Sequence, residues 1–409
     1  MLSHPKTLNQ KARRAFSEYL NNLRSFSRNA RLFLIGTFFM GMGFSGFMLL
    51  FNLYLREFGF LEGRIGNIIS ATTFGIVIMA IPASIILRRF PVKRILILVT
   101  PIAVFSYLVQ VTAAHYYTII AGGLLSGFAS VFFRVAAAPF FMRNSTPKER
   151  PYLFSFQFAF SLVAGIIGNI AGGFLPGVIE TYGFTPLLAY RYTLYIFGGL
   201  VLAAIVPYIL IHEKPAAPTE DRLRLSGSRL IILKLFVPNL VVGLGAGLSI
   251  PFFNLYFKDV FQTPTNLIGI FYSGQQLLMI AGLLLAPVIA ERIGKIRTVV
   301  FSQLISIPFL ITLGITHNLT LAVIAFLVRA TLMNMAQPLF TNFAMEKVTH
   351  EQQPFMSALL VIAWTAGWGV SASFGGYLIE HFSYAVPFFT TSVCYLISTY
   401  LIFTFFSRK

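Results

Sequence analysis

The chain has 409 residues, of which 56% are hydrophobic and only 11% are charged, whereas soluble domains average about 45–50% apolar and about 25% charged residues. This composition excludes a water-soluble protein. The formal net charge of +18 does not require a nucleic acid partner, because basic loops beside the anionic leaflet of a membrane account for it.

Residues 1–31 form a basic N-terminal segment ahead of the first apolar stretch. Apolar residues recur there every three or four positions among lysines and arginines, which predicts a cationic amphipathic helix on the inner leaflet. A basic tail is the alternative, because the segment is also rich in Asn and Ser. In either form we expect it to meet anionic membrane lipids.

Twelve apolar stretches follow, each long enough to cross a bilayer as a helix, which takes about 20 residues. They cover residues 32–55, 65–87, 95–113, 118–142, 152–176, 192–211, 230–256, 266–288, 298–316, 319–345, 355–379 and 385–406. The predicted fold class is an all-α polytopic membrane protein, with six-helix bundles at 32–211 and 230–406 and a cytoplasmic linker at 212–229. The loops are too short for a catalytic domain, so we expect no enzymatic activity and no cofactor.

The basic residues of the loops predict the orientation of the chain, because Lys and Arg accumulate on the cytoplasmic side of membrane proteins. The N-terminal segment, the even-numbered loops and the C-terminus carry 25 of them, counting Lys234 at the start of the seventh span, and the odd-numbered loops carry four. We therefore expect both termini in the cytoplasm, and a multi-pass protein of the cell membrane.

The two halves of the chain repeat each other at a nearly constant spacing. At an offset of 202 residues Phe51-Asn52-Leu53-Tyr54 matches Phe253-Asn254-Leu255-Tyr256, and at an offset of 203 Gly172-Gly173 matches Gly375-Gly376. Each half contains an even number of predicted spans, so both copies enter the membrane in the same orientation. This predicts a parallel repeat about an axis along the membrane normal.

A charged loop motif follows the eighth span and reads Pro287-Val288-Ile289-Ala290-Glu291-Arg292-Ile293-Gly294-Lys295-Ile296. After the second span Arg89 keeps its place, but Arg88 stands where the acid would be and Pro91 where the glycine would be. With the six-plus-six repeat, this motif resembles the major facilitator superfamily, whose signature there is G-x-L-A-D-R-x-G-R-[KR]. The resemblance implies transport by alternating access, with Arg89, Glu291, Arg292 and Gly294 in the loops that gate it.

The fifth span carries Gly168, Gly172 and Gly173 where the superfamily's antiporter motif would lie, with Asn169 in place of its proline. The resemblance implies efflux by exchange. Close packing between helices explains the same glycines and is the alternative.

Only two basic residues and no acids fall well inside the predicted spans: Arg134 in the fourth and Arg329 in the tenth. A charge at that depth costs at least about 2.5–3.5 kcal/mol on insertion scales, so such residues usually face the bundle interior or a wet cavity. The planar guanidinium favours a carboxylate or phosphate partner. We expect both arginines to bind an anionic group of the substrate. In the alternative, Arg134 reaches toward the loop beside Arg143 and Arg329 caps main-chain carbonyls.

Three uncharged polar residues complete the predicted substrate site. Asn52 and Asn254 are a matched pair of the repeat on the first and seventh spans, and Gln337 lies two turns from Arg329 on the tenth. In the superfamily that the chain resembles, the first, fourth, seventh and tenth helices surround the central cavity. Hydrogen bonds between helices are the alternative role for the asparagines. Trp364 and Trp368, one turn apart, form either an aromatic portal or a lipid-facing pair.

Proton-driven transporters commonly relay protons through buried carboxylates or histidines, and no such residue falls mid-span here. Proton coupling would have to use acids at the outer helix ends, such as Glu57 and Asp259. Exchange or facilitated diffusion is the alternative.

These observations predict a secondary active or facilitative transporter, working as a monomer, that moves a small organic anion or zwitterion. No metal site is expected. One alternative is a multidrug efflux antiporter for hydrophobic compounds, suggested by the 15% aromatic content. The other is a translocase for lysolipids or glycolipids, for which two cavity arginines and an aromatic portal would also serve.

Overall fold

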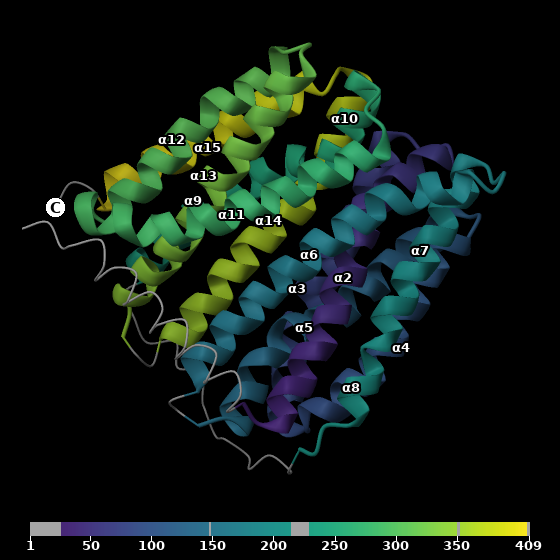
Figure 1. Ribbon diagram of the computed structural model, residues 1–409. Coiled ribbons are helices and arrows are strands. Elements are labelled where there is room, and N and C mark those ends of the chain that lie inside the picture. The colour runs from purple at the N-terminus through teal and green to yellow at the C-terminus, as the bar shows by residue number, and fades with distance from the viewer. Residues whose placement is uncertain (1–25, 147–148, 214–228, 350–351, 407–409) are drawn as a thin grey trace, which may run out of the picture.

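The computed structural model describes residues 26–146, 149–213, 229–349 and 352–406 (Figure 1). Most of the predicted N-terminal amphipathic helix, and most of the predicted linker, lie outside these residues. Within them the regular structure is helical, and twelve spans are long and apolar enough to cross a membrane. The predicted fold class is thereby confirmed.

The first six spans are formed by seven helices. They are α2 (Arg28–Glu57), α3 (Glu62–Arg89), α4 (Val92–Thr112), α5 (Tyr116–Asn144), α6 (Arg150–Glu180), and α7 (Pro186–Ala203) followed by α8 (Ile205–Ile209). The helices extend beyond the predicted apolar stretches. As a result Arg191, which lies just outside the predicted span at 192–211, belongs to α7, where it donates a hydrogen bond to the Tyr54 hydroxyl at 3.2 Å.

The last six spans begin with a broken one, made of α9 (Arg229–Ser249), the short 3₁₀ helix η1 (Ile250–Phe252) and α10 (Phe253–Phe261). The others are α11 (Thr265–Ile293), α12 (Lys295–Ile315), α13 (Leu319–Glu346), α14 (Gln353–His381) and α15 (Ala385–Phe406). The break falls at Pro251, which has no N–H to continue the α-helical hydrogen bonding. Its counterpart α2 runs unbroken.

The helices pack in two groups that follow the repeat. In the first group α2 contacts α6 and α7, and α3 contacts α5; in the second, α9 contacts α14 and α15, and α11 contacts α13. The main contacts between the groups are α3 with α14 and α6 with α11. These two contacts are equivalent under the repeat, because α3 corresponds to α11 and α6 corresponds to α14. The two groups are therefore related by an approximate two-fold axis, and Figure 1 shows them side by side.

Small residues allow the closest helix contacts. A Cβ atom added to Gly127 of α5 would lie 2.0 Å from the Thr72 carbonyl oxygen of α3, and one added to Gly168 of α6 would lie 2.4 Å from the Met42 carbonyl oxygen of α2. A Cβ atom on Gly173 would lie 3.0 Å from the Cα atom of Gly269, which belongs to the other bundle. Packing of this kind is what replaces the hydrophobic effect between membrane helices.

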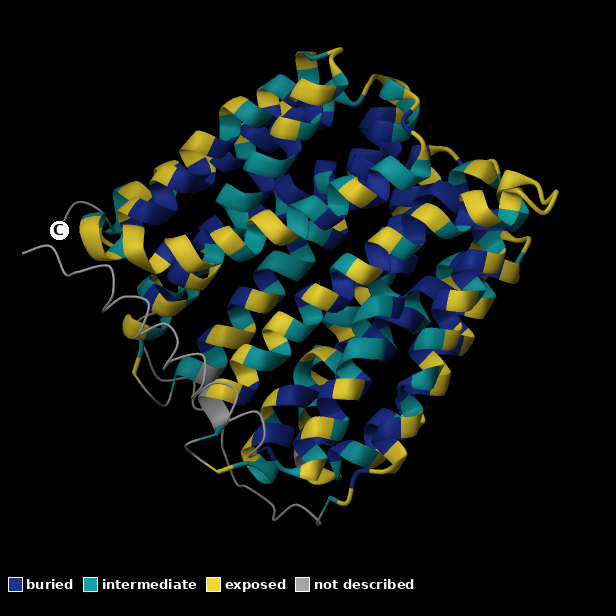
Figure 2. Ribbon diagram, viewed as in Figure 1, coloured by how far each residue is buried: buried dark blue, intermediate teal, exposed yellow. Residues whose placement is uncertain are grey.

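Exposed residues lie mostly on the outward faces of both bundles, and buried residues mostly face neighbouring helices (Figure 2). Many of the exposed residues are large and apolar. Leu98, Leu284 and Tyr400, for example, are 64%, 72% and 66% exposed. So much exposed apolar surface is costly in water but is the normal surface of a protein in lipid.

The bundles meet at one end and diverge toward the other (Figure 1). The meeting end holds the ion pair between Arg56 and Asp259, and the hydrogen bond from the Gly63 N–H to Glu380. The diverging end holds ion pairs within a bundle, which join Arg143 to Glu213 and Lys295 to Glu346. The structure is closed at the end that carries the odd-numbered loops.

Candidate functional site

A cavity of about 410 Å³ lies between the two bundles. The first bundle contributes α2, α3, α4 and α5 to its wall, and the second contributes η1, α10, α11 and α14. Its polar lining residues are Asn52, Thr72, Thr73, Gln110, Ser126, Ser130, Arg134, Asn254 and Thr365, and its aromatic ones are Phe44, Phe47, Phe51, Tyr107, Tyr272, Trp364 and Trp368. Among the described residues of this wall, Arg134 is the one cation, and there is no Asp, Glu or His.

Arg134 reaches the cavity because of its register on α5. Ser126, Ser130 and Arg134 follow one another at four-residue spacing, which puts them on one face of the helix. Gly127, the glycine between Ser126 and Ser130, packs against α3. The Arg134 side chain is accessible in the cavity, with Tyr107 nearby. Within the described chain it forms no hydrogen bond and no ion pair, so its charge is available to a ligand.

Asn52 and Asn254 line the cavity where the bundles meet, and each also joins the two bundles. The Asn52 Nδ2 donates to the Pro251 carbonyl oxygen at 2.7 Å, and the Asn254 Nδ2 donates to the Leu49 carbonyl oxygen at 2.8 Å. The Asn254 Oδ1 accepts the Leu255 N–H at 3.0 Å. Both roles that the sequence left open are therefore compatible with the structure.

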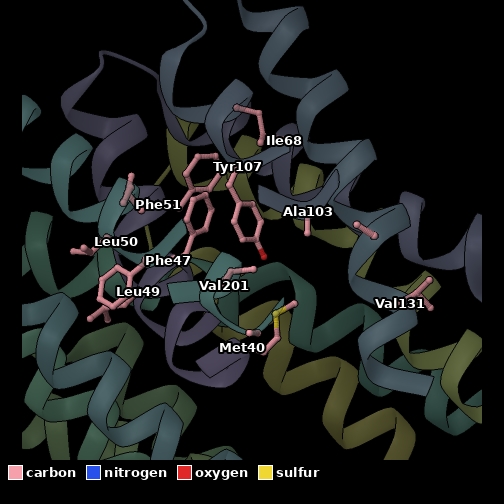
Figure 3. Close-up of a cluster of buried hydrophobic side chains, with 14 of the residues drawn as sticks. Met40, Phe47, Leu49, Leu50, Phe51, Ile68, Ala103, Tyr107, Val131 and Val201 are labelled. Atoms are coloured by element: carbon pink, nitrogen blue, oxygen red, sulfur yellow. The ribbon is translucent and has the colours of Figure 1, made fainter. Parts of the chain in front are cut away.

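Stacked aromatic rings form much of the wall. Phe47 stacks on Tyr107 with ring centroids 4.2 Å apart and on Phe51 with centroids 5.0 Å apart (Figure 3). On the opposite side Trp364 and Trp368 lie with centroids 5.9 Å apart. Both tryptophans line the cavity. Such a wall offers flat apolar surface to a ligand.

Arg329 lies outside the cavity lining and is buried, with 2% of its surface exposed. Its guanidinium carbon is 5.1 Å from the centroid of the Phe253 ring. The Tyr395 hydroxyl lies beside the guanidinium. Neither that hydroxyl nor the Arg329 Nε has a hydrogen-bonding partner in the described chain. The two mid-span arginines, which the sequence assigned to one site, thus occupy different environments.

Gln337 also lies away from the cavity. It borders a small pocket inside the second bundle, lined by residues of α9, α12, α13 and α15. At the repeat offset of 203, Gln337 corresponds to Arg134 and Arg329 corresponds to Ser126. The first bundle turns both of its positions toward the cavity, and the second bundle turns neither.

The residues predicted to gate the loops are at the ends of their helices. Arg89, Glu291 and Arg292 are exposed, and none of them forms an ion pair within the described residues. Gly294 has a φ of 88° and links α11 to α12. A left-handed residue at this turn favours glycine.

Charged contacts that the loop motif does not predict hold these helix ends instead. Glu213 accepts the Lys93 N–H at 2.9 Å and lies 3.6 Å from the Arg143 Nη1. In the second bundle Lys295 binds Glu346. The repeat indicates that these charged positions correspond between the bundles, because Lys93 matches Lys295 at an offset of 202 and Arg143 matches Glu346 at an offset of 203.

A second charged cluster closes the meeting end. Arg56 of α2 lies 3.3 Å from Glu62 and 3.8 Å from Asp259 of α10. The Tyr384 hydroxyl, in the turn between α14 and α15, donates to Asp259 at 2.7 Å. Burial raises the pKa of Tyr384, and the neighbouring Asp259 carboxylate raises it further. Asp259 is therefore a paired acid of the closed end, while Glu57 borders a separate pocket of about 320 Å³ at the same end.

The chemistry of the cavity is that of a binding site. Its described residues offer one cation, amides, hydroxyls and aromatic rings, and no acid or base that could turn over a substrate. Across the described chain no cluster of His, Cys, Asp and Glu could hold a metal ion.

Comparisons with known proteins agree with this picture. None of the curated protein sequences matches the chain. Among solved structures, the nucleoside transporter NupG is 14% identical, with a TM-score of 0.73, and the match covers 94% of this chain and 100% of that one. A bacterial homologue of the human lysosomal transporter Spinster, inward-facing and unoccupied, is 14% identical with a TM-score of 0.75, over 93% of this chain and 97% of that one. The human organic anion transporter MFSD10 is 16% identical with a TM-score of 0.58, over 92% and 99%.

At such low identity these structures establish the shared fold. The family assignment rests on the sequence itself. The family model of the Major Facilitator Superfamily matches residues 33–241 and 235–409, nearly the whole chain. The structural neighbours are transporters, and none of these matches is to an enzyme. The chain is therefore a multi-pass integral membrane protein that belongs to the Major Facilitator Superfamily of transporters.

Proposed function

We propose that the protein is a secondary transporter that binds a small organic anion with an aromatic or apolar body at Arg134 and moves it by alternating access. The observation that carries the proposal is the Arg134 guanidinium, which is accessible in the central cavity and unpaired within the described chain. A cation at membrane depth is costly, and an anionic ligand would offset that cost.

The charge of the cavity supports an anion over a cation or a zwitterion. A cationic drug or the ammonium group of a zwitterion needs a carboxylate for an ion pair, and none lies among the described lining residues. An anion finds the planar donor fork of Arg134, which suits carboxylate and phosphate groups. Multidrug export of lipophilic cations is accordingly disfavoured.

The size and surface of the cavity support an aromatic or apolar body. Its volume of about 410 Å³ falls in the range of about 300–1,000 Å³ that is typical of small-molecule sites. Phe47, Tyr107, Trp364 and Trp368 present ring faces and edges on two sides. A planar body can lie between them while its anionic group meets Arg134.

The loop charges orient the transport cycle. With the basic even-numbered loops in the cytoplasm, the structure is closed to the outside and open to the inside. Alternating access then requires the outer contacts of Asn52, Arg56 and Asn254 to break while the inner helix ends approach. Glu291, Arg292, Gly294 and Arg89 belong to those ends and are proposed to close them.

The composition of the site favours exchange or facilitated diffusion over proton symport, because no described lining residue is an acid or a histidine. The glycines of α6 do not add support for efflux. Gly168 packs on α2 and Gly173 on α11, so helix packing accounts for them.

The proposal is tested with purified protein in proteoliposomes and naphthoate, a planar aromatic anion, as the probe. We expect naphthoate uptake by the unmodified protein, uptake at least about tenfold lower in Arg134→Gln, and partial recovery in Arg134→Lys, because a charge-assisted hydrogen bond is lost and then partly restored. Arg94→Gln is the matched control, since Arg94 is an exposed arginine at the start of α4.

Uptake that is the same in Arg134→Gln and Arg94→Gln would overturn the proposal. So would a protein that transports naphthylmethylammonium, the corresponding cation, and not naphthoate.

A further inference from the structure

Arg329 is the only buried basic residue among those described, with 2% of its surface exposed. No acid lies beside it, since each ion pair in the described chain involves another residue. Its neighbours are uncharged: the Phe253 ring at 5.1 Å and the hydroxyl groups of Tyr272 and Tyr395. A charge held at this depth without a counter-charge points to a function.

The hydrogen bonding around Arg329 is incomplete. The Nε atom of Arg329 and the hydroxyl oxygen of Tyr395 are both buried, and although the two side chains lie beside each other, neither atom forms a hydrogen bond of normal geometry within the described chain. Buried polar groups are normally paired, and each exception calls for an explanation. Donors that stay unpaired in this conformation can bind an anion in another one.

Arg329 lies close to the cavity wall. Phe253, whose ring lies against the guanidinium, precedes Asn254 and follows Pro251 by two residues, and both Asn254 and Pro251 line the cavity. Tyr272 touches both sides, because it lines the cavity and lies beside Arg329. The counterpart of Arg329 in the first bundle is Ser126, which faces the cavity directly.

Phe253 belongs to the part of the structure that closes the outer end. It is the first residue of α10, directly after the 3₁₀ break. Hydrogen bonds from Asn52 to Pro251 and from Asn254 to Leu49 tie this break to α2 of the other bundle. When the outer end opens, these bonds must break, and α10 is free to move relative to α13, which carries Arg329.

We infer that Arg329 is the anion contact of the outward-open state, uncovered when Phe253 moves with α10. This inference rests on the proposed anion transport. Arg134 holds the anion while the inner side is open, and Arg329 holds it while the outer side is open. The substrate then always faces one unpaired arginine, although the two arginines lie in different bundles.

The test separates the two states. Replacing Arg56 and Asp259 by cysteines in a Cys394→Ser background, and joining them with a short bifunctional thiol reagent, locks the outer end closed. Naphthoate binding is measured in this locked protein, and naphthoate exchange is measured in unlocked protein in proteoliposomes. Two variants are compared: Arg329→Lys keeps the charge, and Arg329→Met keeps the apolar stem without it.

We expect both variants to bind naphthoate in the locked protein as their parent does, because Arg329 is covered there. In exchange, Arg329→Met should be at least about tenfold slower than Arg329→Lys, because only lysine offers charged donors to the anion. A third variant, Phe253→Ala, removes the ring that lies against the guanidinium. In the locked protein Phe253→Ala should bind naphthoate more tightly, and adding Arg329→Met should cancel that gain.

Equal exchange by the Lys and Met variants would show that Arg329 only packs, and would overturn the inference. Weaker naphthoate binding by locked Arg329→Met would also overturn it, by placing Arg329 in the inward-open site. Failure of the proposed function is a separate result, namely naphthoate binding that survives Arg134→Gln in the locked protein.

Discussion

At the scale of single residues, the two asparagines of the repeat lie between the cavity and the closed end of the bundles. Each donates to a main-chain carbonyl of the opposite bundle. One of the acceptors, the Pro251 carbonyl oxygen, lies in the 3₁₀ break of the seventh span. A ligand that reaches the asparagines would compete for the hydrogen bonds that hold the outer end closed.

We therefore predict that Asn52→Ala loosens the outer closure by about 1–3 kcal/mol, the cost of leaving a buried acceptor without its donor. The measurement is labelling of a Ser126→Cys reporter in the cavity by an impermeant thiol reagent added outside, in a Cys394→Ser background. Thr112→Ala is the control, because the Thr112 hydroxyl bonds only to the Leu108 carbonyl of its own helix. Labelling that is no faster in Asn52→Ala than in the control would contradict the prediction.

Tyr384 gives a prediction with a pH dependence. Its hydroxyl donates to Asp259, and burial beside that carboxylate raises its pKa. A pKa raised in the folded state means that the stabilisation is complete below the unfolded value of about 10 and is lost as the pH rises above it. Tyr384→Phe should therefore lower the stability by about 1–2 kcal/mol from about pH 6 to 9, and the difference should shrink above about pH 10.

Thermal unfolding of Tyr384→Phe and of the unmodified protein across this pH range is the measurement. Tyr182→Phe serves as the control, since Tyr182 is 77% exposed in the turn after α6. A stability difference for Tyr384→Phe that grows above pH 10 would have the wrong sign.

The sequence predicted which side chains lie deep in the membrane, but it could not tell which of them a ligand can reach. Arg134 and Arg329 both stood out as mid-span charges. Their accessibility depends on which neighbours cover them, and the cover of Arg329 is Phe253, more than seventy residues away in the chain. Gln337 was expected at the substrate site because of its depth near Arg329. The rotation of a helix about its axis, and not depth alone, decides which pocket a side chain lines, and Gln337 lines the pocket inside the second bundle.

At the scale of helices, close contacts through small residues decide how the bundles hold together. Gly127 and Gly75 bring α5 and α3 to within main-chain contact, and Gly173 and Gly269 do the same for α6 and α11 across the bundles. Gly168, Gly172 and Gly173, which the resemblance links to antiport, therefore have a role in helix packing.

Two glycine substitutions should behave in opposite ways. Gly127→Ala places a Cβ atom 2.0 Å from the Thr72 carbonyl oxygen, so we expect a loss of about 1–3 kcal/mol from overpacking. Gly199→Ala on α7 meets nothing within 4 Å, so we expect no loss and a gain of up to about 1 kcal/mol from helix propensity. Thermal unfolding of both variants in nanodiscs decides, and equal destabilisation of the two would refute the packing account.

The break in the seventh span marks the limit of prediction for helices. Pro251 interrupts its span, whereas Pro82, Pro101, Pro139 and Pro176 lie inside continuous helices of the first bundle. A proline removes one hydrogen bond wherever it occurs, but the geometry that follows depends on the other contacts of the segment. At the break, one such contact is the hydrogen bond that Asn52 of the other bundle donates to the Pro251 carbonyl oxygen, which no local pattern could show.

At the scale of the whole molecule, the repeat and the composition were enough to predict twelve spans and the family, and both are confirmed. The conformation was not predictable from them. A parallel repeat relates one bundle to the other and does not relate the two ends of the molecule, so it does not predict which end is closed. The closed end is determined by specific contacts such as Arg56 with Asp259, whose partners lie in different bundles.

The central claim is that the unpaired Arg134 selects an anion. The most direct measurement is thermal stabilisation of the purified protein by a matched series of naphthoate, naphthalene methanol and naphthylmethylammonium, which share one aromatic body and differ in charge. A ligand present at 100 times its dissociation constant adds about 2.7 kcal/mol to the stability. We predict stabilisation in the order anion, neutral, cation, and loss of the anion's advantage in Arg134→Gln but not in Arg94→Gln. Stabilisation by the cation above the anion would contradict the account and make export of lipophilic cations the leading explanation.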